Sequence, residues 1–304
     1  MIYNLITVLG STACGKTKLA ATLADRFNGE IISADSRQVY KRMNIGTGKD
    51  LQEFLINGRQ VPYHLIDIIE PDDEFNLFSF AEHFAKTFQA ITEKHKTPFL
   101  VGGTGMYLSS VLQNYHLAKT DFNSARRSEL ETMQMDTLSA LLLSLDLKLH
   151  NTTDLLDKER LIKAILVAET TADEEQTGQA KVSSFTIGIQ PDRKILRERI
   201  SERLKFRLQN GMIEEVEQLV AEGISFEKLN FFGLEYRYVG LYLRKELTYN
   251  DMFQKLRAAI NQFAKRQMTW FRKMERDGVV INWLSEADFS EAKNLIESKC
   301  PLFR

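Results

Sequence analysis

The chain has 304 residues, 43% of them hydrophobic, which suits one large domain or two smaller ones with a substantial core. Its formal net charge of −1 excludes a polycation that binds nucleic acid over its whole surface, although a local basic face remains open. Cys14 and Cys300 lack the spacing of a metal site or a disulfide framework, which fits a reducing cytoplasm. The apolar runs at 5–9 and 138–145 are too short for a signal peptide or a membrane span, so we expect a cytoplasmic protein with no membrane partner.

Strand and helix patterns alternate in the first third of the chain. Apolar segments at 3–10 and 29–36 predict strands, and apolar residues spaced by four predict a helix over 16–27 between them. A second amphipathic helix over 80–91 precedes a buried strand that ends in glycines, 97–105. This alternation predicts an α/β fold: a parallel sheet of the P-loop NTPase kind, flanked by helices on both faces.

The rest of the chain is mostly helical. Residues 117–156 are helical and polar, which predicts a short inserted cap, and 183–190 predicts one more strand. Two long helical segments follow, 195–222 and 252–276. We therefore divide the chain into a first part of the core over 1–116, a helical insertion over 117–156, and the remaining core with a helical C-terminal region over 157–304.

A glycine-rich segment after the first strand has the pattern G-x-x-x-x-G-K-T, with a strand before it and a helix after it. Its glycines allow successive N–H groups to turn toward an anion, and the helix N-terminus adds positive charge. Lys16 is placed to reach terminal phosphate oxygens, and the Thr17 hydroxyl is placed to bind Mg²⁺. The predicted phosphate-binding loop consists of Gly10, Ser11, Thr12, Ala13, Cys14, Gly15, Lys16 and Thr17.

The second strand ends in Asp35, at the sheet edge where ligands of open α/β folds bind. We expect this strand beside the phosphate loop, with Asp35 as a general base toward an acceptor; the alternative is a residue that caps the next turn. The strand at 98–101 ends in Gly102 rather than in the aspartate that a hydrolysing NTPase uses for Mg²⁺. Asp67 is an alternative for that role.

Several segments together resemble the tRNA dimethylallyltransferases, also called tRNA isopentenyltransferases: GSTACGKT, GEIISADSRQVYKRMNIGTGK, VPYHLIDIIEPDDEFNLFSF, LVGGTGMYL, RISERLKFRLQNGMIEEV and FAKRQMTWFRK. The resemblance implies transfer of a dimethylallyl group from dimethylallyl pyrophosphate to N6 of the adenosine just 3′ of the anticodon in tRNA. It further implies an Mg²⁺-dependent enzyme with catalytic residues Asp35, Thr17 and Arg203. Nothing in the sequence demands more than a monomer.

The resemblance also implies residues that contact the tRNA anticodon stem-loop. These are Ser36 and Gln38 after the second strand, Gly103, Thr104 and Gly105 after the third, Arg160 beyond the insertion, and Lys265, Arg266 and Arg272 on the last long helix. The insertion is expected to contact tRNA as well. For the glycines the alternative is a purely structural turn between strand and helix.

A charge asymmetry supports a basic face. Residues 193–276 hold 18 lysines and arginines against 11 acidic residues. On the last helix polar, mostly basic side chains recur every three or four residues from Gln262 to Arg276. Ile260 and Phe263 are expected to point to the core, as is Trp270. The alternative is an ordinary solvated helix face.

Two departures from the family pattern stand out. The segment before Asp157 is short, and Glu235, Tyr236 and Arg237 occupy a turn that is G-Y-R in many relatives. Three other functions also stay open: prenylation of a free adenine nucleotide, ATP-dependent phosphorylation of a small molecule, and RNA binding without catalysis.

Overall fold

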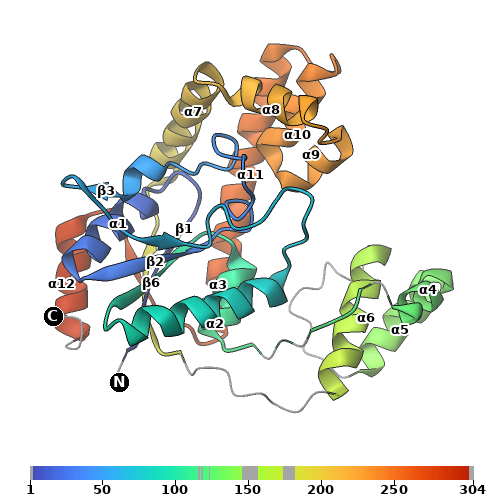
Figure 1. The fold of residues 1–304 in the computed structure, drawn as a ribbon, viewed down its shortest axis with the longest axis horizontal. Helices are drawn as coiled ribbons and strands as arrows, with labels where there is room; N and C mark the ends of the chain where they lie inside the picture. Colours follow the sequence, from blue (N-terminus) through green and yellow to red (C-terminus); the bar gives the residue numbers. More distant parts are fainter. Residues whose placement is uncertain are drawn as a thin grey trace. The chain divides into compact units, whose positions relative to one another are not determined.

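The computed structural model describes residues 3–115, 117, 119–122, 124–145, 157–173 and 182–300. The chain forms two compact units. One, here the core unit, comprises Met1–Asn114 and Ala180–Arg304, and the other, here the insert unit, comprises Tyr115–Gln179 (Figure 1).

A six-stranded sheet forms the centre of the core unit, in the order β5-β2-β6-β1-β7-β8. Its strands are all parallel: β1 (Leu5–Gly10), β2 (Gly29–Ala34), β5 (Tyr63–His64), β6 (Thr97–Gly102), β7 (Ser184–Ile189) and β8 (Ile281–Leu284). Every residue of β1, β2 and β6 is buried, as expected of parallel strands that are covered on both faces. The predicted parallel α/β fold is confirmed.

The strand order corrects one expectation. The second strand does not lie beside the first, because β6 pairs with both of them. Gly102 at the end of β6 is in register with Leu9 on one side and with Ala34 on the other. The segments that follow β1 and β2 therefore lie on opposite sides of the turn that follows β6.

Successive residues of β1 point to the two opposite faces of the sheet, and each face has its own apolar core. Ile6 and Val8 belong to the core that includes residues of α1 (Lys16–Arg26) and α12 (Phe289–Lys299). Leu5 and Leu9 belong to the larger core on the other face, which includes residues of α2 (Leu77–Glu93) and α3 (Gly105–Leu112). A short helical turn, η1 (Leu51–Phe54), and a hairpin, β3 (Leu55–Ile56) with β4 (Arg59–Gln60), lie between β2 and β5.

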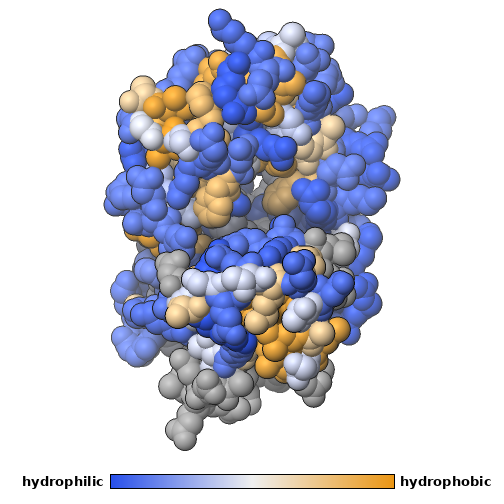
Figure 2. Space-filling model, turned by 90° about the vertical axis from the view of Figure 1, so that its right-hand side faces the viewer, coloured by the Kyte–Doolittle hydropathy of each residue, from blue (hydrophilic) through white to orange (hydrophobic). Residues whose placement is uncertain are grey.

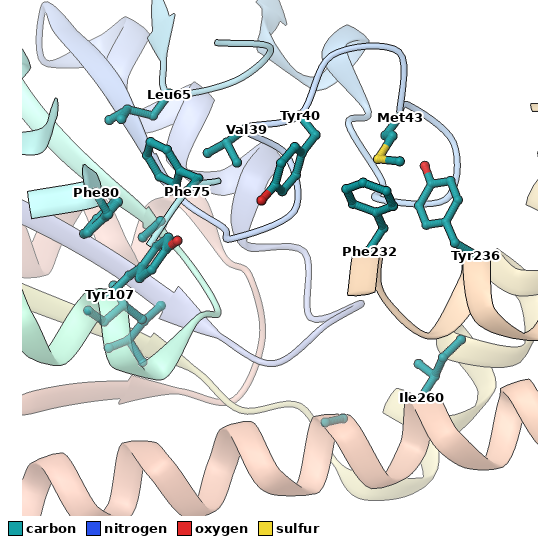
Figure 3. Close-up of a cluster of buried hydrophobic side chains, with 14 of the residues drawn as sticks. Val39, Tyr40, Met43, Leu65, Phe75, Phe80, Tyr107, Phe232, Tyr236 and Ile260 are labelled. Atoms are coloured by element: carbon teal, nitrogen blue, oxygen red, sulfur yellow. The ribbon is translucent and has the colours of Figure 1, made fainter. Parts of the chain in front are cut away.

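Aromatic rings join the helices over the larger core. The ring of Phe80 on α2 stacks on Tyr107 of α3 with centroids 4.0 Å apart. Tyr40, from the loop after β2, meets Phe232 edge-on at 5.1 Å (Figure 3). The first contact joins α2 to α3, and the second connects the loop after β2 to the C-terminal helices.

The C-terminal helices are α7 (Arg193–Gln209), α8 (Met212–Ala221), α9 (Phe226–Phe232), α10 (Leu234–Leu243) and α11 (Tyr249–Arg276). The predicted single segment over 195–222 is wrong, because Gly211 takes the left-handed conformation with φ 99° and separates α7 from α8. The strand β8 was not predicted. Its four residues pair with β7 after the turn at Gly278 and are too few to show a period.

The insert unit contains α4 (Ala125–Thr132), α5 (Met135–Ser144) and α6 (Lys158–Asp173). It has an apolar core of its own, in which Leu161 and Ile165 of α6 pack with Leu138 and Leu142 of α5. Because of this packing α6 belongs to the insert unit, whereas the sequence placed the boundary at 156 and assigned α6 to the remaining core.

Hydrophilic side chains predominate on the face drawn in Figure 2, and the apolar ones form separate patches among them. No helix in the described part of the chain combines the length and the apolar character that crossing a bilayer requires.

Candidate active site

A cavity of about 620 Å³ lies at the carboxyl ends of β1, β2 and β6 in the core unit. Its lining brings together predicted site residues from five separate segments. These are Thr12, Ala13, Gly15, Lys16, Thr17, Asp35, Ser36, Gln38, Gly103, Thr104, Gly105, Arg203 and Arg266.

Six predicted residues are not part of that lining. Ser11 and Cys14 are buried within the loop after β1, and Gly10 is the last residue of that strand. Lys265 and Arg272 are exposed on α11, and Arg160 is exposed near the start of α6 in the insert unit.

The loop after β1 has the backbone of an anion-binding turn. Ala13 and Gly15 have left-handed conformations, with φ 63° and 88°, and α1 begins directly after Gly15. The N-terminus of α1, with Lys16 and Thr17 in its first turn, therefore faces the cavity. The Lys16 ammonium is 3.4 Å from the Ser11 carbonyl oxygen, so it lies folded back over its own loop.

Thr12 departs from the predicted pattern of loop amides that face an anion. Its N–H donates to Oε1 of Gln267 on α11 at 2.8 Å, and its hydroxyl accepts a hydrogen bond from Arg203 on α7. Thr12 is thus held by two C-terminal helices. Sequence reasoning missed Gln267, because only its burial in the fold distinguishes it from the other polar residues of α11.

Of the two roles that the sequence left open for Asp35, the structure shows the capping role. Its Oδ1 accepts from the backbone N–H of Arg37 at 2.8 Å and of Gln38 at 3.4 Å, so the carboxylate does cap the turn after β2. The same carboxylate lines the cavity. No hydrogen bond to Oδ2 is found among the described residues, so this oxygen is available to a ligand.

The turns after β2 and β6 are tied to each other. The Ser36 N–H donates to the Thr104 hydroxyl at 3.1 Å, and the Thr104 N–H donates to the Ala34 carbonyl at 3.2 Å. The Gln38 side-chain amide accepts from the Ser33 hydroxyl at 3.2 Å and donates to the Gly48 carbonyl at 3.0 Å. An amide nitrogen has two N–H groups and an amide oxygen has two lone pairs, so these two bonds orient the Gln38 side chain and still leave it capacity to bind a base.

Packing within the protein explains why glycines follow β6. A Cβ on Gly103 would overlap the Gln267 side-chain nitrogen, and a Cβ on Gly105 would overlap the Trp270 ring. Trp270 is partly buried and its Nε1 donates to the Ser109 hydroxyl at 2.7 Å. Contacts within the protein are therefore enough to explain glycine at both positions, as the structural alternative expected, whether or not a ligand binds at the turn.

The cavity also contains charged residues that the sequence analysis did not assign to the site. Arg207, one helical turn after Arg203, is only 8% exposed at its side chain and pairs with Asp50 at 2.9 Å. Burial, with repulsion from Arg207, lowers the pKa of Arg203 to about 10, so Arg203 remains a cation at neutral pH. Burial raises the pKa of Glu235, while the two arginines oppose that shift. The i, i+4 spacing of the arginines was the available sequence signal.

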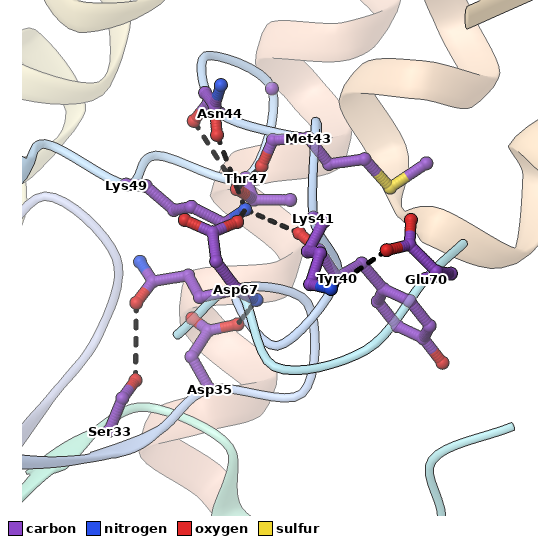
Figure 4. A network of polar contacts seen from close by, with 12 residues as sticks. Ser33, Asp35, Tyr40, Lys41, Met43, Asn44, Thr47, Lys49, Asp67 and Glu70 are labelled. Atoms are coloured by element: carbon purple, nitrogen blue, oxygen red, sulfur yellow. Dashed lines mark hydrogen bonds and ion pairs between the residues drawn. The ribbon is translucent and has the colours of Figure 1, made fainter. Parts of the chain in front are cut away.

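Asp67 has a structural partner. The buried Lys49 ammonium donates to the Asp67 carboxylate and to the Tyr40 carbonyl oxygen (Figure 4). Asp67 does not line the cavity. Its carboxylate neutralises a buried cation, and this favours a structural role over the Mg²⁺ role considered as an alternative.

The oxygen donors of the cavity fit a magnesium ion that is shared with a phosphate ligand. The Thr17 hydroxyl and the carboxylates of Asp35, Asp50 and Glu53 belong to one lining. Within the described ranges, no group of three or more His, Cys, Asp and Glu could hold a metal on its own. Mg²⁺ usually binds through one or two protein oxygens and completes its shell with phosphate oxygens and waters.

The three basic side chains predicted on α11 are exposed, and one of them, Arg266, also lines the cavity. Lys265, Arg266 and Arg272 are exposed, and the Arg266 guanidinium is 6.0 Å from the centroid of the Phe263 ring. Phe263 is 39% exposed and lines the cavity, so its predicted place in the core is wrong. Ile260 is buried as expected.

Comparison with known proteins identifies the family. A family model described as IPP transferase matches residues 38–274, and one described as isopentenyl transferase matches residues 3–65. The chain belongs to the IPP transferase family. The resemblance to tRNA dimethylallyltransferases is thereby confirmed, and with it the assignment as a prenyltransferase enzyme.

Relatives of this IPP transferase cover nearly its whole length. A protein of Geotalea daltonii named tRNA dimethylallyltransferase 1 is 53% identical over 94% of this chain and 92% of its own. A protein of Bacteroides fragilis named tRNA dimethylallyltransferase 2 is 47% identical over 99% of each.

Solved structures agree with this family. The tRNA isopentenylpyrophosphate transferase of Bacillus halodurans has a TM-score of 0.69 and 30% identity, covering 97% of this chain and 96% of its own. A eukaryotic dimethylallyltransferase acting on tRNA has a TM-score of 0.75 at 22% identity, and this match shows the fold alone.

Proposed function

We propose that this enzyme transfers the dimethylallyl group of dimethylallyl pyrophosphate to N6 of the adenosine 3′-adjacent to the anticodon in tRNA, with release of pyrophosphate. The observation that carries the proposal is the shared lining of one cavity: a phosphate-binding loop on one side of the turn after β6 and Asp35 on the other. The relatives named above support the choice of tRNA as acceptor.

The donor's pyrophosphate would bind at the loop after β1. When an allylic C–O bond breaks, negative charge grows on the leaving pyrophosphate, and groups already in place lower the barrier by stabilising it. Lys16, Arg203 and the N-terminus of α1 supply positive charge on that side of the cavity. Arg203 stays protonated at neutral pH even though it is desolvated, so its charge is available throughout the reaction.

Thr17 would hold Mg²⁺ through its hydroxyl, together with the pyrophosphate oxygens. The ion, when bound, supplies further neutralisation of the leaving group.

Asp35 would act on the acceptor. The exocyclic amine of adenine is a weak nucleophile, because its lone pair is delocalised into the ring. A carboxylate held by the backbone of Arg37 and Gln38 can accept the amine proton through Oδ2 as the new C–N bond forms. Such general-base assistance contributes roughly 10²–10⁴-fold in rate.

The target adenosine would leave the stack of the anticodon loop and enter the cavity, as bases do in enzymes that act on base atoms. Arg266 and Phe263 at the cavity and Lys265 and Arg272 beside it on α11 would contact the RNA. Arg160 would provide a contact from the insert unit. We further propose that the enzyme acts as a monomer in the cytoplasm.

The proposal is tested with purified enzyme, dimethylallyl pyrophosphate and Mg²⁺, offered tRNA or AMP, followed by mass analysis of the nucleosides. We expect N6-prenylated adenosine in the tRNA digest and none in AMP. Labelling of AMP alone would refute the tRNA assignment. ATP-dependent phosphorylation without any use of the allylic donor would establish a kinase instead, and tRNA binding without turnover would establish a non-catalytic relative.

A further inference from the structure

Gln267 is a buried polar residue in the middle of α11, only 7% exposed. Both ends of its side-chain amide bind main-chain groups from distant parts of the chain. Oε1 accepts from the Thr12 N–H at 2.8 Å, and Nε2 donates to the Gly103 carbonyl at 2.9 Å. One side chain thus joins the loop after β1 to the turn after β6.

The surroundings are shaped for this amide. Gly103 has no room for a Cβ because Nε2 of Gln267 occupies that place. One turn further along α11, Trp270 packs over Gly105 and hydrogen-bonds Ser109. The helix therefore packs against the β6–α3 turn through two side chains, Gln267 and Trp270. Of these two, Gln267 also contacts the phosphate loop.

At neutral pH a carboxamide meets both requirements at this position, whereas a carboxylate or an aliphatic side chain does not. Thr12 presents a donor and Gly103 an acceptor, so the side chain must accept at one atom and donate at the other. A carboxylate would accept from Thr12 but place negative charge against the Gly103 carbonyl. An aliphatic side chain would remove the partner of the half-buried Thr12 N–H and of the buried Gly103 carbonyl, which is costly for the buried group.

The Thr12 residue held by Gln267 is also the residue that binds Arg203 through its hydroxyl. The position of Thr12 therefore determines where the guanidinium lies relative to Lys16 and the N-terminus of α1. We propose that Gln267 is a positioning residue of the pyrophosphate site, which holds Thr12, and through it Arg203, in the arrangement that binds the leaving group. The identity of the donor rests on the proposed function, whereas the placement of an anion site does not.

The test measures binding of inorganic pyrophosphate with Mg²⁺ by titration calorimetry, in the absence of tRNA. The variants are Gln267→Glu, which keeps the shape of the side chain, and Gln267→Leu, which removes both hydrogen bonds. Gln254→Glu is the matched control, since Gln254 is exposed on the same helix and its side chain accepts a hydrogen bond from Arg257. We expect Gln267→Glu to weaken pyrophosphate binding about tenfold, and Gln254→Glu to leave it unchanged.

A pH series separates positioning from general damage. The carboxyl group introduced by Gln267→Glu could again donate to Gly103 once it is protonated. Lowering the pH should therefore restore part of the pyrophosphate binding of this variant, relative to the wild type at the same pH. In turnover, the KM for dimethylallyl pyrophosphate should rise while the KM for tRNA stays constant.

Wild-type pyrophosphate affinity in Gln267→Glu at neutral pH would overturn the inference, as would equal rises of both KM values with a lowered melting temperature. The inference and the proposed function fail separately. If the wild type binds pyrophosphate but prenylates no tRNA, only the proposed function is refuted. If both Gln267 variants show normal prenylation and normal donor affinity, only the inference about Gln267 is refuted.

Discussion

Asp35 uses its two carboxylate oxygens differently. Oδ1 is held by the N–H groups of Arg37 and Gln38, which fixes the orientation of the group, and in the proposed reaction Oδ2 would accept the proton of the acceptor amine. A general base must be correctly positioned before its basicity matters, and the turn after β2 would position this one.

Replacing Asp35 by Asn separates these two roles, because the amide oxygen can still accept from the turn while the base is lost. We expect kcat to fall on the order of 100-fold or more, with pyrophosphate binding unchanged. Rapid-quench measurement of prenyl transfer at saturating donor and tRNA gives the rate. A rate within a few-fold of wild type would reduce Asp35 to a capping residue.

Thr17 offers a second test at this scale. Thr17→Ala should raise the Mg²⁺ concentration needed for half-maximal activity, or abolish activity, because the hydroxyl ligand is gone. Thr17→Ser keeps the hydroxyl and should restore most of the wild-type metal dependence. If an Mg²⁺ titration gave the same midpoint for Thr17→Ala and the wild type, Thr17 would not be a ligand.

The sequence predicted site residues whose contacts are close in the chain, and it missed one whose contacts are far apart in the chain. Lys16 and Thr17 belong to a local motif whose geometry is set by neighbouring glycines, so a single segment predicts them. Gln267 acquires its role from Thr12 and Gly103, which are 255 and 164 positions away. Only the folded structure brings these three together.

At the scale of elements, α11 has two functional faces. Its inner face carries Gln267 and Trp270, which dock on the β6–α3 turn, and its outer face carries exposed basic side chains. One helix thus borders both the phosphate loop and the surface proposed for RNA.

The Lys265→Ala and Arg266→Ala double variant should weaken tRNA binding and reduce the slope of log affinity against log salt by about 1–2. Filter binding across a salt series measures both quantities. The matched control replaces Arg193 and Lys194, an adjacent exposed pair at the start of α7, and should keep the wild-type slope. An unchanged slope in the α11 variant would place the RNA contact elsewhere.

The sequence predicted helices and strands where the apolar periodicity extends over many residues. It did not predict which strands lie next to each other in the sheet. The apolar spacing of α2 and α11 revealed both helices, whereas the four residues of β8 could not reveal a strand. The insertion of β6 between β1 and β2 depends on a chain crossing that no local pattern encodes. Asp35 nevertheless reaches the cavity, since all three strands end at the same edge.

At the scale of the whole molecule, the chain has separate cores in its two units. The insert unit buries Leu138 in a cluster formed by its own helices. A unit with its own core can lose stability without unfolding its neighbour.

Leu138→Ala should therefore destabilise the insert unit by about 2–5 kcal/mol. In hydrogen-exchange mass spectrometry, peptides of α5 and α6 should lose protection while those of β1 and β6 keep it. Equal loss of protection in the sheet would contradict the separation into two units.

In the proposed reaction the phosphate loop binds a pyrophosphate that leaves carbon. A donor that carries one radiolabel in the allyl group and another in the terminal phosphate tests this most directly, with tRNA as acceptor. The carbon label should enter tRNA while the phosphate label is released as pyrophosphate. Phosphate label on the acceptor, or no transfer of carbon, would contradict it.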